Sequence, residues 1–129
     1  MSPPVGRRTG RRQALFLLYQ WDLTGQAMAS LYEGEPDEFA RSLAEAVASR
    51  APILDSRITR SSPDWPADRL GTLERNILRI GVYELEEGTV PHEVAINEAV
   101  VLAKRYASED AARLVNGILG RVAREEGAA

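Results

Sequence analysis

Four arginines lie near the start of the chain, before its first acidic residue: Arg7, Arg8, Arg11 and Arg12. In a helix, the repeat of about 100° per residue gathers Arg8, Arg11, Arg12, Leu15 and Tyr19 on one side. Guanidinium groups neutralise phosphate oxygens, and a tyrosine ring can stack on an unpaired base. This pattern predicts a surface that binds single-stranded nucleic acid. The alternative is an exposed cation–π pair between Tyr19 and a neighbouring arginine, which requires no ligand.

The charge distribution agrees with a basic segment of this kind. The whole chain has a net charge of −3, whereas residues 1–21 carry +4, which leaves −7 for the remainder. This asymmetry indicates that the basic segment meets an anion, above all a nucleic acid, while the acidic remainder stays in solution or meets a basic protein. A solvated helix start is the alternative.

The arginines and Tyr19 belong to a predicted first helix. Its core face is formed by Ala14, Leu17, Leu18 and Trp21, and Thr24 and Gly25 end it. Residues 26–35 fit either a short helix or an ordered loop. A further amphipathic stripe over residues 37–50 consists of Phe39, Leu43, Ala46 and Val47. Because a proline inside a helix removes a hydrogen bond, we expect a new or kinked helix near Pro52.

Residues 67–87 form the longest helical stretch and are apolar on two faces. A helix of this kind is packed from both sides, so it is predicted to be central. We expect a break near Gly71 and a C-terminal cap at Gly88.

Two dense helical patterns meet at a corner within residues 91–120. Pro91 can occupy the first position of the first helix, and Ser108 can cap the second. Asn116 and Gly117 interrupt the second pattern, where glycine costs about 1 kcal/mol relative to alanine. We interpret Gly117 as a site of close backbone packing and Asn116 as a partner of a buried polar group; a binding role is the alternative.

Composition excludes several classes of protein. There is no cysteine and only one histidine, His92, so we expect neither a metal site nor a cofactor. The glutamates of the second half are expected to face solvent, namely Glu84, Glu86, Glu87, Glu93 and Glu98. We therefore predict a non-enzymatic, cytoplasmic, all-α protein of six to seven helices, folded as one domain over residues 1–129. Residues 1–6 and 124–129 are expected to fray.

Three stretches carry a family likeness: LLYQWDLTG at 17–25, LERNILRIGVYELEEG at 73–88 and VPHEVAINEAVVLAKRYASEDAARLVNGILG at 90–120. On these residues the chain resembles the NusB family of bacterial transcription antitermination factors. The resemblance runs from about residue 7 to residue 122. It implies two helical subdomains packed across each other.

The resemblance also implies a function and its partners. Family members pair with NusE, a small-subunit ribosomal protein, bind the boxA element of nascent RNA and act with other Nus factors in the RNA polymerase antitermination complex, notably on rRNA operons. The residues implied to bind RNA are Arg7, Arg8, Arg11, Arg12, Tyr19, Asp110, Arg113 and Leu114. The acid implied to face NusE is Glu74.

Some residues depart from the family pattern. Leu114 stands where members often have phenylalanine, so apolar contact replaces base stacking there. Gly10 weakens the helix within the arginine segment and favours an arm that orders only on RNA. Asp110 repels phosphate, so we expect it to cap a helix and to limit affinity.

Two alternatives accompany this hypothesis. The first alternative is a self-associating interaction protein, because the resemblance implies that some NusB-like proteins form homodimers. The other is a relative of the N-terminal domain of an rRNA cytosine methyltransferase, although a catalytic domain is missing from this sequence.

Overall fold

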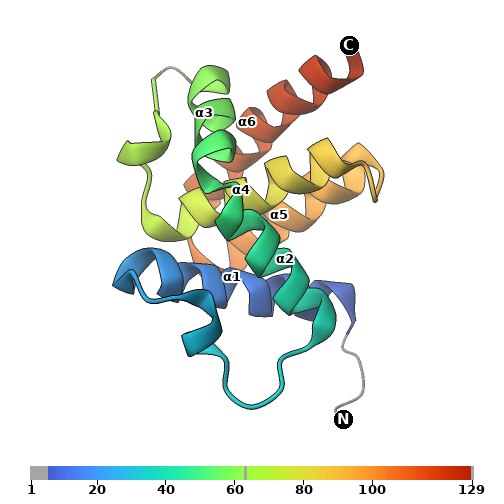
Figure 1. Ribbon diagram of the computed structural model, residues 1–129. Coiled ribbons are helices and arrows are strands. Elements are labelled where there is room, and N and C mark those ends of the chain that lie inside the picture. Colours follow the sequence, from blue (N-terminus) through green and yellow to red (C-terminus); the bar gives the residue numbers. More distant parts are fainter. Residues whose placement is uncertain (1–5, 63, 129) are drawn as a thin grey trace. The chain divides into compact units, whose positions relative to one another are not determined.

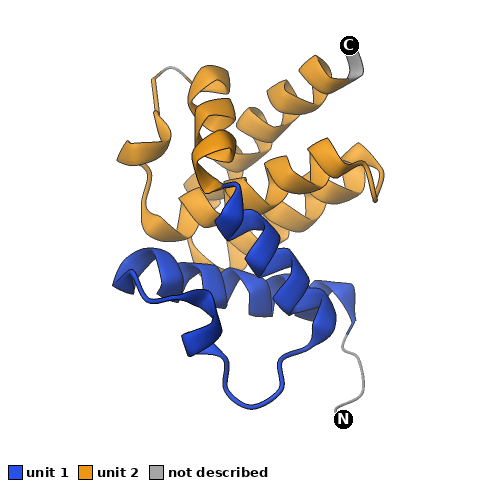
Figure 2. Cartoon of the chain, in the orientation of Figure 1, with its two compact units in different colours: residues 1–50 blue, residues 51–129 orange. Residues whose placement is uncertain are grey.

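The computed structural model describes residues 6–62 and 64–128, and every regular element in this part of the chain is helical. The chain divides into two compact units, Met1–Arg50 and Ala51–Ala129 (Figure 2). Unit 1 contains α1 (Arg7–Thr24), the short 3₁₀ helix η1 (Met28–Leu31) and α2 (Glu38–Ser49). Unit 2 contains α3 (Ala51–Ser61), the 3₁₀ helix η2 (Ala67–Arg69), α4 (Thr72–Glu87), α5 (His92–Tyr106) and α6 (Glu109–Ala128) (Figure 1). The predicted all-α class of six to seven helices is confirmed, since the described residues form six α-helices.

In unit 1, α1 packs against α2 and η1. A Cβ at Gly10 would lie 2.5 Å from the ring of Phe39, so the missing side chain lets this ring approach the α1 backbone. Gly10 is buried inside a helix that begins at Arg7. The expectation that glycine leaves the arginine segment disordered is therefore wrong, because packing against Phe39 compensates for the low helix propensity.

In unit 2, α4 contacts α3, α5 and α6, as expected for a helix that is apolar on two faces. Its buried side chains include Ile77, Leu78 and Val82, all inaccessible to solvent. Gly81 lies among them, and a Cβ there would be 2.5 Å from Cδ1 of the fully buried Leu119. The α4 glycine therefore allows α6 to pack closely.

Most helix ends lie where capping chemistry predicted them. Gly25 and Gly88 end α1 and α4 with φ of 74° and 67°, a left-handed conformation that glycine adopts without strain. The amide of Ala111 donates to Ser108 Oγ at 3.0 Å, which confirms the predicted cap of α6. Pro91 was predicted at the first helical position of α5, but it is the N-cap residue, and the helix begins at His92.

Several other expectations are corrected or settled. The open choice over residues 26–35 resolves into a short 3₁₀ turn followed by irregular chain. Helix α6 continues through Ala128, past the point where fraying was predicted; residues 1–5 and 129 lie outside the described part. Glu84 was expected to face solvent, yet it is buried within α4.

Asn116 and Gly117 differ most from their predicted roles. Both are exposed, and no atom lies within 4 Å of a Cβ built at Gly117. Gly117 lies on the solvent side of α6 because it is about 150° from the centre of the stripe formed by Val115, Ile118, Leu119 and Val122, at 100° per residue. Close packing is therefore not the reason for this glycine, and the binding alternative stays open.

The two glycines give a matched pair of stability predictions. We expect Gly81→Ala to lower the free energy of unfolding by about 2 kcal/mol, because the new methyl group overlaps the buried Leu119. We expect Gly117→Ala to raise it by about 0.5–1 kcal/mol, because alanine favours the helix and meets open space. Urea unfolding measures the free energy of unfolding of both variants. Equal changes in the two variants would contradict the close packing of Leu119 against Gly81.

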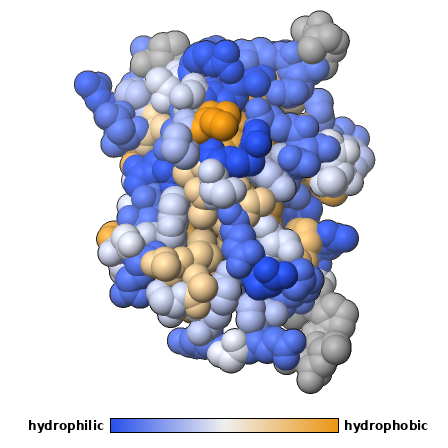
Figure 3. All heavy atoms as spheres, in the orientation of Figure 1, coloured by the Kyte–Doolittle hydropathy of each residue, from blue (hydrophilic) through white to orange (hydrophobic). Residues whose placement is uncertain are grey.

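The one face drawn in Figure 3 is mostly polar. On the face shown in Figure 3, hydrophilic residues cover most of the area, and strongly hydrophobic residues occupy small separate spots. Among the described residues, no helix is long and apolar enough to span a membrane.

Candidate nucleic-acid interface

The exposed side of α1 is narrower than the sequence pattern indicated. Arg8 and Tyr19 are exposed and Arg12 is partly exposed. These three side chains project in one direction, within about 40° of each other on a helix of 3.6 residues per turn. Arg11 and Leu15, which were predicted to share this face, are 4% and 0% exposed. The cationic aromatic face therefore consists of Arg8, Arg12 and Tyr19.

Two arginines contact the ring of Phe39 from α2. The guanidinium carbon of Arg7 lies 4.4 Å from the ring centroid, and that of Arg11 lies 5.7 Å away. A guanidinium over an aromatic face is attracted by the ring quadrupole. Arg7 is exposed and can still meet a phosphate, whereas the buried Arg11 contributes to packing and does not belong to the accessible surface.

A second group of site residues surrounds Trp65 in unit 2. A hollow of about 460 Å³ is lined by residues from three segments, including Trp65, Arg69, Glu74, Asp110 and Leu114. A neighbouring hollow of about 290 Å³ is lined by Trp65, Arg113, Leu114, Gly117 and Arg121, among others. Trp65 and Leu114 line both, so the two hollows form one surface, named here the Trp65 surface.

Local hydrogen bonds position Trp65. Its amide donates to Ser62 O at 3.0 Å, and the amide of Ala67 donates to Thr59 Oγ1 at 3.0 Å. Arg121 Nη1 of α6 donates to Ser61 O at 3.2 Å, which holds the start of the loop beside α6. The indole is held in this loop yet is 53% exposed.

The charges of the Trp65 surface are mixed. Asp110 and Arg113 form an ion pair one helical turn apart in α6, and both side chains are mostly exposed. A pair of this kind contributes little to stability and can open to bind a ligand. Asp110 also lies in the first turn of α6, where its charge is favourable against the helix dipole.

Glu74 occupies the third position of α4, and its carboxylate folds back toward Gly71 at the helix start. There it interacts favourably with the unpaired amides of the first turn. It also lines the hollow with Asp110 and Leu114. The structure therefore places Glu74, which the family resemblance implies to face NusE, beside residues that the resemblance implies to bind RNA.

Sequence reasoning missed Trp65. The signal was present in residues 61–66, SSPDWP, where an aromatic residue stands between two prolines in a predicted loop. Prolines in a loop keep the chain out of helices, and a large aromatic residue in such a loop is often a binding residue. The nearness of this loop to Leu114 arises only from tertiary packing.

The sequence matches the model of the NusB family over residues 8–124. The chain belongs to the NusB family. It is 40% identical to the transcription antitermination protein NusB of Myxococcus xanthus, over 91% of this chain and 94% of that protein. It is also 40% identical to the protein of the same name from Rubrobacter xylanophilus, over 89% and 88% of the two chains.

Solved structures of NusB proteins have the same fold. T. maritima NusB superposes with a TM-score of 0.82 at 30% identity, covering 95% of this chain and 94% of that one. NusB from a complex of the antitermination factors NusB and NusE with double-stranded RNA gives a TM-score of 0.80 at 30% identity, with 92% and 96% coverage.

Proposed function

We propose that this NusB-family chain is a non-enzymatic RNA-binding adaptor in transcription antitermination. It pairs with NusE and binds boxA RNA, and it supports transcription of rRNA operons together with other Nus factors. Support comes from the curated relatives, which are named transcription antitermination proteins, and from the similar structure that contains NusE and RNA.

The single observation that carries the RNA-binding role is the Arg8–Arg12–Tyr19 face of α1. It combines two guanidinium groups with an exposed phenol ring on one side of a regular helix. Phosphate neutralisation and base stacking are the two contributions by which proteins hold unpaired RNA. Arg7 adds a third cation at the start of the same helix.

The Trp65 surface supplies a second part of the proposed RNA site. Leu114 contributes apolar contact, and the neighbouring indole of Trp65 provides the aromatic face that Leu114 lacks. Arg113 and Arg69 can neutralise phosphates, while the carboxylate of Asp110 can accept hydrogen bonds from base amino groups. Glu74 lines the same hollow, and we keep its assignment to NusE, so this surface lies beside the proposed NusE contact.

Removing the two cations of α1 tests this function. We expect Arg8→Ala/Arg12→Ala to weaken binding of boxA RNA about fivefold at moderate salt. Each lost phosphate contact on single-stranded RNA also lowers the slope of log affinity against log salt by about 0.7. The slope should therefore fall by about 1.4 in a salt titration followed by fluorescence anisotropy.

The control removes two exposed arginines elsewhere, as Arg60→Ala/Arg124→Ala. This variant has the same net charge as the test variant, so it separates a local contact from a general effect of charge. An equal loss of affinity and slope in both variants would contradict a site on α1.

A further inference from the structure

The first turns of α1 lack the local features that favour the start of a helix. The residue before the helix is Gly6, which has no side chain to accept the free amides, and the first turn contains no acid. Instead, Arg7 and Arg8 place positive charge at the positive end of the helix dipole. The four arginines also form two like-charge pairs at a spacing of four residues, and such pairs destabilise a helix. Local sequence therefore does not account for a helix that begins at Arg7.

Gly10 weakens this segment further, because only proline is less favourable than glycine inside a helix. Even so, the amide of Gly10 donates to Gly6 O at 2.8 Å, a hydrogen bond that closes the first turn. The three atoms nearest to a Cβ built at Gly10 all belong to the ring of Phe39, at 2.5, 3.2 and 3.5 Å. The glycine therefore leaves the space that this ring fills.

The same ring contacts two of the arginines. The guanidinium carbons of Arg7 and Arg11 lie 4.4 and 5.7 Å from its centroid. Arg11 is only 4% exposed, so the electron-rich face of the ring replaces part of the water around this cation. Phe39 thus packs on the backbone of α1 and also offsets part of the unfavourable positive charge at the helix start.

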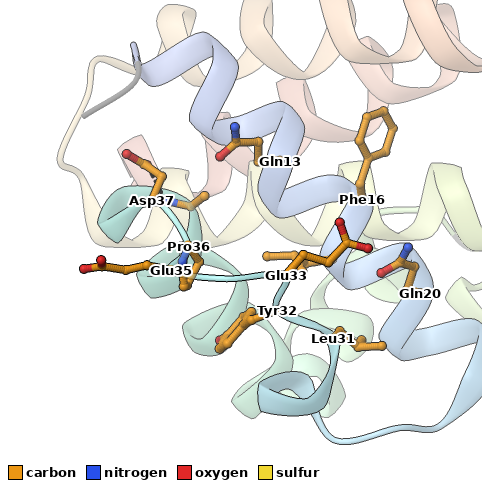
Figure 4. Close-up of a pocket in the computed structure, with 11 residues that line it drawn as sticks. Gln13, Phe16, Gln20, Leu31, Tyr32, Glu33, Glu35, Pro36 and Asp37 are labelled. Carbon is orange, nitrogen blue, oxygen red and sulfur yellow. Dashed lines mark hydrogen bonds between the residues drawn. The ribbon is translucent and has the colours of Figure 1, made fainter. Parts of the chain in front are cut away.

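The start of α2 holds Phe39 in place. Phe39 is the second residue of α2, and the amide of Ala40 donates to the capping carboxylate of Asp37 at 3.0 Å. This capped start lies against α1, because Gln13 lines one groove with Pro36 and Asp37. Figure 4 shows these three side chains at the same end of that groove. The ring therefore projects from a fixed helix end onto the first turns of α1.

We infer that Phe39 is a positioning residue for RNA binding, which keeps the arginine segment, residues 7–12 of α1, helical before RNA arrives. The inference rests on the proposed function. Arg8 and Arg12 point in one direction only while this segment is helical, because the helical repeat aligns them. A segment that is unfolded in the free chain must fold on binding, and the apparent affinity falls in proportion to the folded fraction. Phe39 thus sets the RNA affinity without touching the RNA.

Removing the ring tests this role. We expect Phe39→Ala to weaken binding of boxA RNA about tenfold, which corresponds to about one free chain in ten with a folded arginine segment. RNA refolds the segment, so the complex keeps its phosphate contacts and the slope of log affinity against log salt should be unchanged. Arg8→Ala/Arg12→Ala lowers that slope, so a reduced slope in Phe39→Ala would contradict a positioning role.

Amide exchange measured by NMR reports the folding of the segment directly. In free Phe39→Ala, the amide at position 10 should exchange faster than in the parent chain, and RNA should restore its protection. Phe39→Leu keeps an apolar side chain without the ring, so it should show the same pattern with a smaller loss of affinity. Parent-level exchange and affinity in both variants would overturn the inference.

The double variant Gly10→Ala/Phe39→Ala provides a rescue. Without the ring, a Cβ at position 10 no longer overlaps it, and alanine favours the helix over glycine by a factor of about five. The double variant should therefore bind RNA about fivefold more tightly than Phe39→Ala. Gly10→Ala alone should not tighten binding, because its Cβ would lie 2.5 Å from the ring. A double variant that binds no better than Phe39→Ala would also overturn the inference.

Leu31→Ala is the control. It removes a half-buried apolar side chain of η1, which shares the groove with Leu17 and Gln20 in the second half of α1. It should lower the melting temperature and leave RNA affinity unchanged; a loss equal to that of Phe39→Ala would show that affinity follows the stability of unit 1 as a whole, against the inference. A parent chain that fails to bind boxA RNA would refute the proposed function, whereas unchanged exchange at position 10 in Phe39→Ala refutes the positioning role alone.

Discussion

Replacing Trp65 by alanine is expected to weaken RNA binding by about 2 kcal/mol, roughly 30-fold, with little change in stability. Stacking of one base on an aromatic side chain contributes about 1–3 kcal/mol. Trp65 is 53% exposed, so its removal leaves no large buried cavity and the fold persists. Trp65→Phe keeps an aromatic face and should retain most of the affinity.

Fluorescence gives a direct measure of the contact. The chain has two tryptophans, and Trp21→Phe leaves Trp65 as the only indole. Stacking on a base quenches indole emission, so RNA should quench this variant at the same concentrations at which it binds. Ile53→Ala, which removes another large exposed side chain of unit 2, is the control for affinity. RNA that binds without quenching Trp65, and with equal affinity for Trp65→Ala, would remove this residue from the proposed site.

This prediction also accounts for the departure at position 114. Stacking from the loop residue Trp65 makes an aromatic side chain on α6 unnecessary, because both residues line the same hollows. The double variant Trp65→Ala/Leu114→Phe should then recover part of the lost affinity. Recovery would show that the two positions supply the same contact from different segments.

The helices could be predicted from sequence because apolar spacing and caps are local properties. Ser108, Gly25 and Gly88 act within one turn of their own position, and each acts as predicted. The helical spacing also predicts which polar residues of a helix are buried. Arg11 falls in the angular sector of Ala14 and Leu18, and its burial follows from that position.

The candidate site was less predictable, because its parts come from segments that are distant in sequence. Arg8, Arg12 and Tyr19 could be found because one helix carries all three. The contact between the Trp65 loop and Leu114 depends on α6 holding that loop through Arg121, which no local pattern encodes. The assignment of Glu74 came from resemblance alone, and only its place in the hollow connects it with Asp110.

Replacing Asp55 by alanine is expected to lower the free energy of unfolding by about 3 kcal/mol. Arg79 of α4 is only 5% exposed, and its Nε and Nη2 donate to the two carboxylate oxygens of Asp55 in α3, both at 2.7 Å. Losing the carboxylate leaves a buried cation without its bidentate partner, which costs about 3–5 kcal/mol in a fully buried pair. The Asp55 side chain is 29% exposed, so water can reach the Arg79 guanidinium once the carboxylate is gone. The expected loss of stability is therefore at the lower end of this range.

A double-mutant cycle identifies this mechanism. Arg79→Met removes the buried charge while keeping an apolar stem, so Asp55→Ala/Arg79→Met should be more stable than Asp55→Ala alone. Asp68→Ala, at an exposed position of η2 in the same unit, is the control and should change stability by less than about 0.5 kcal/mol. Urea unfolding measures the stability of all five chains: the parent, the two single variants, the double variant and the control. Additive effects of the two single changes would show that the ion pair between α3 and α4 does not couple these helices.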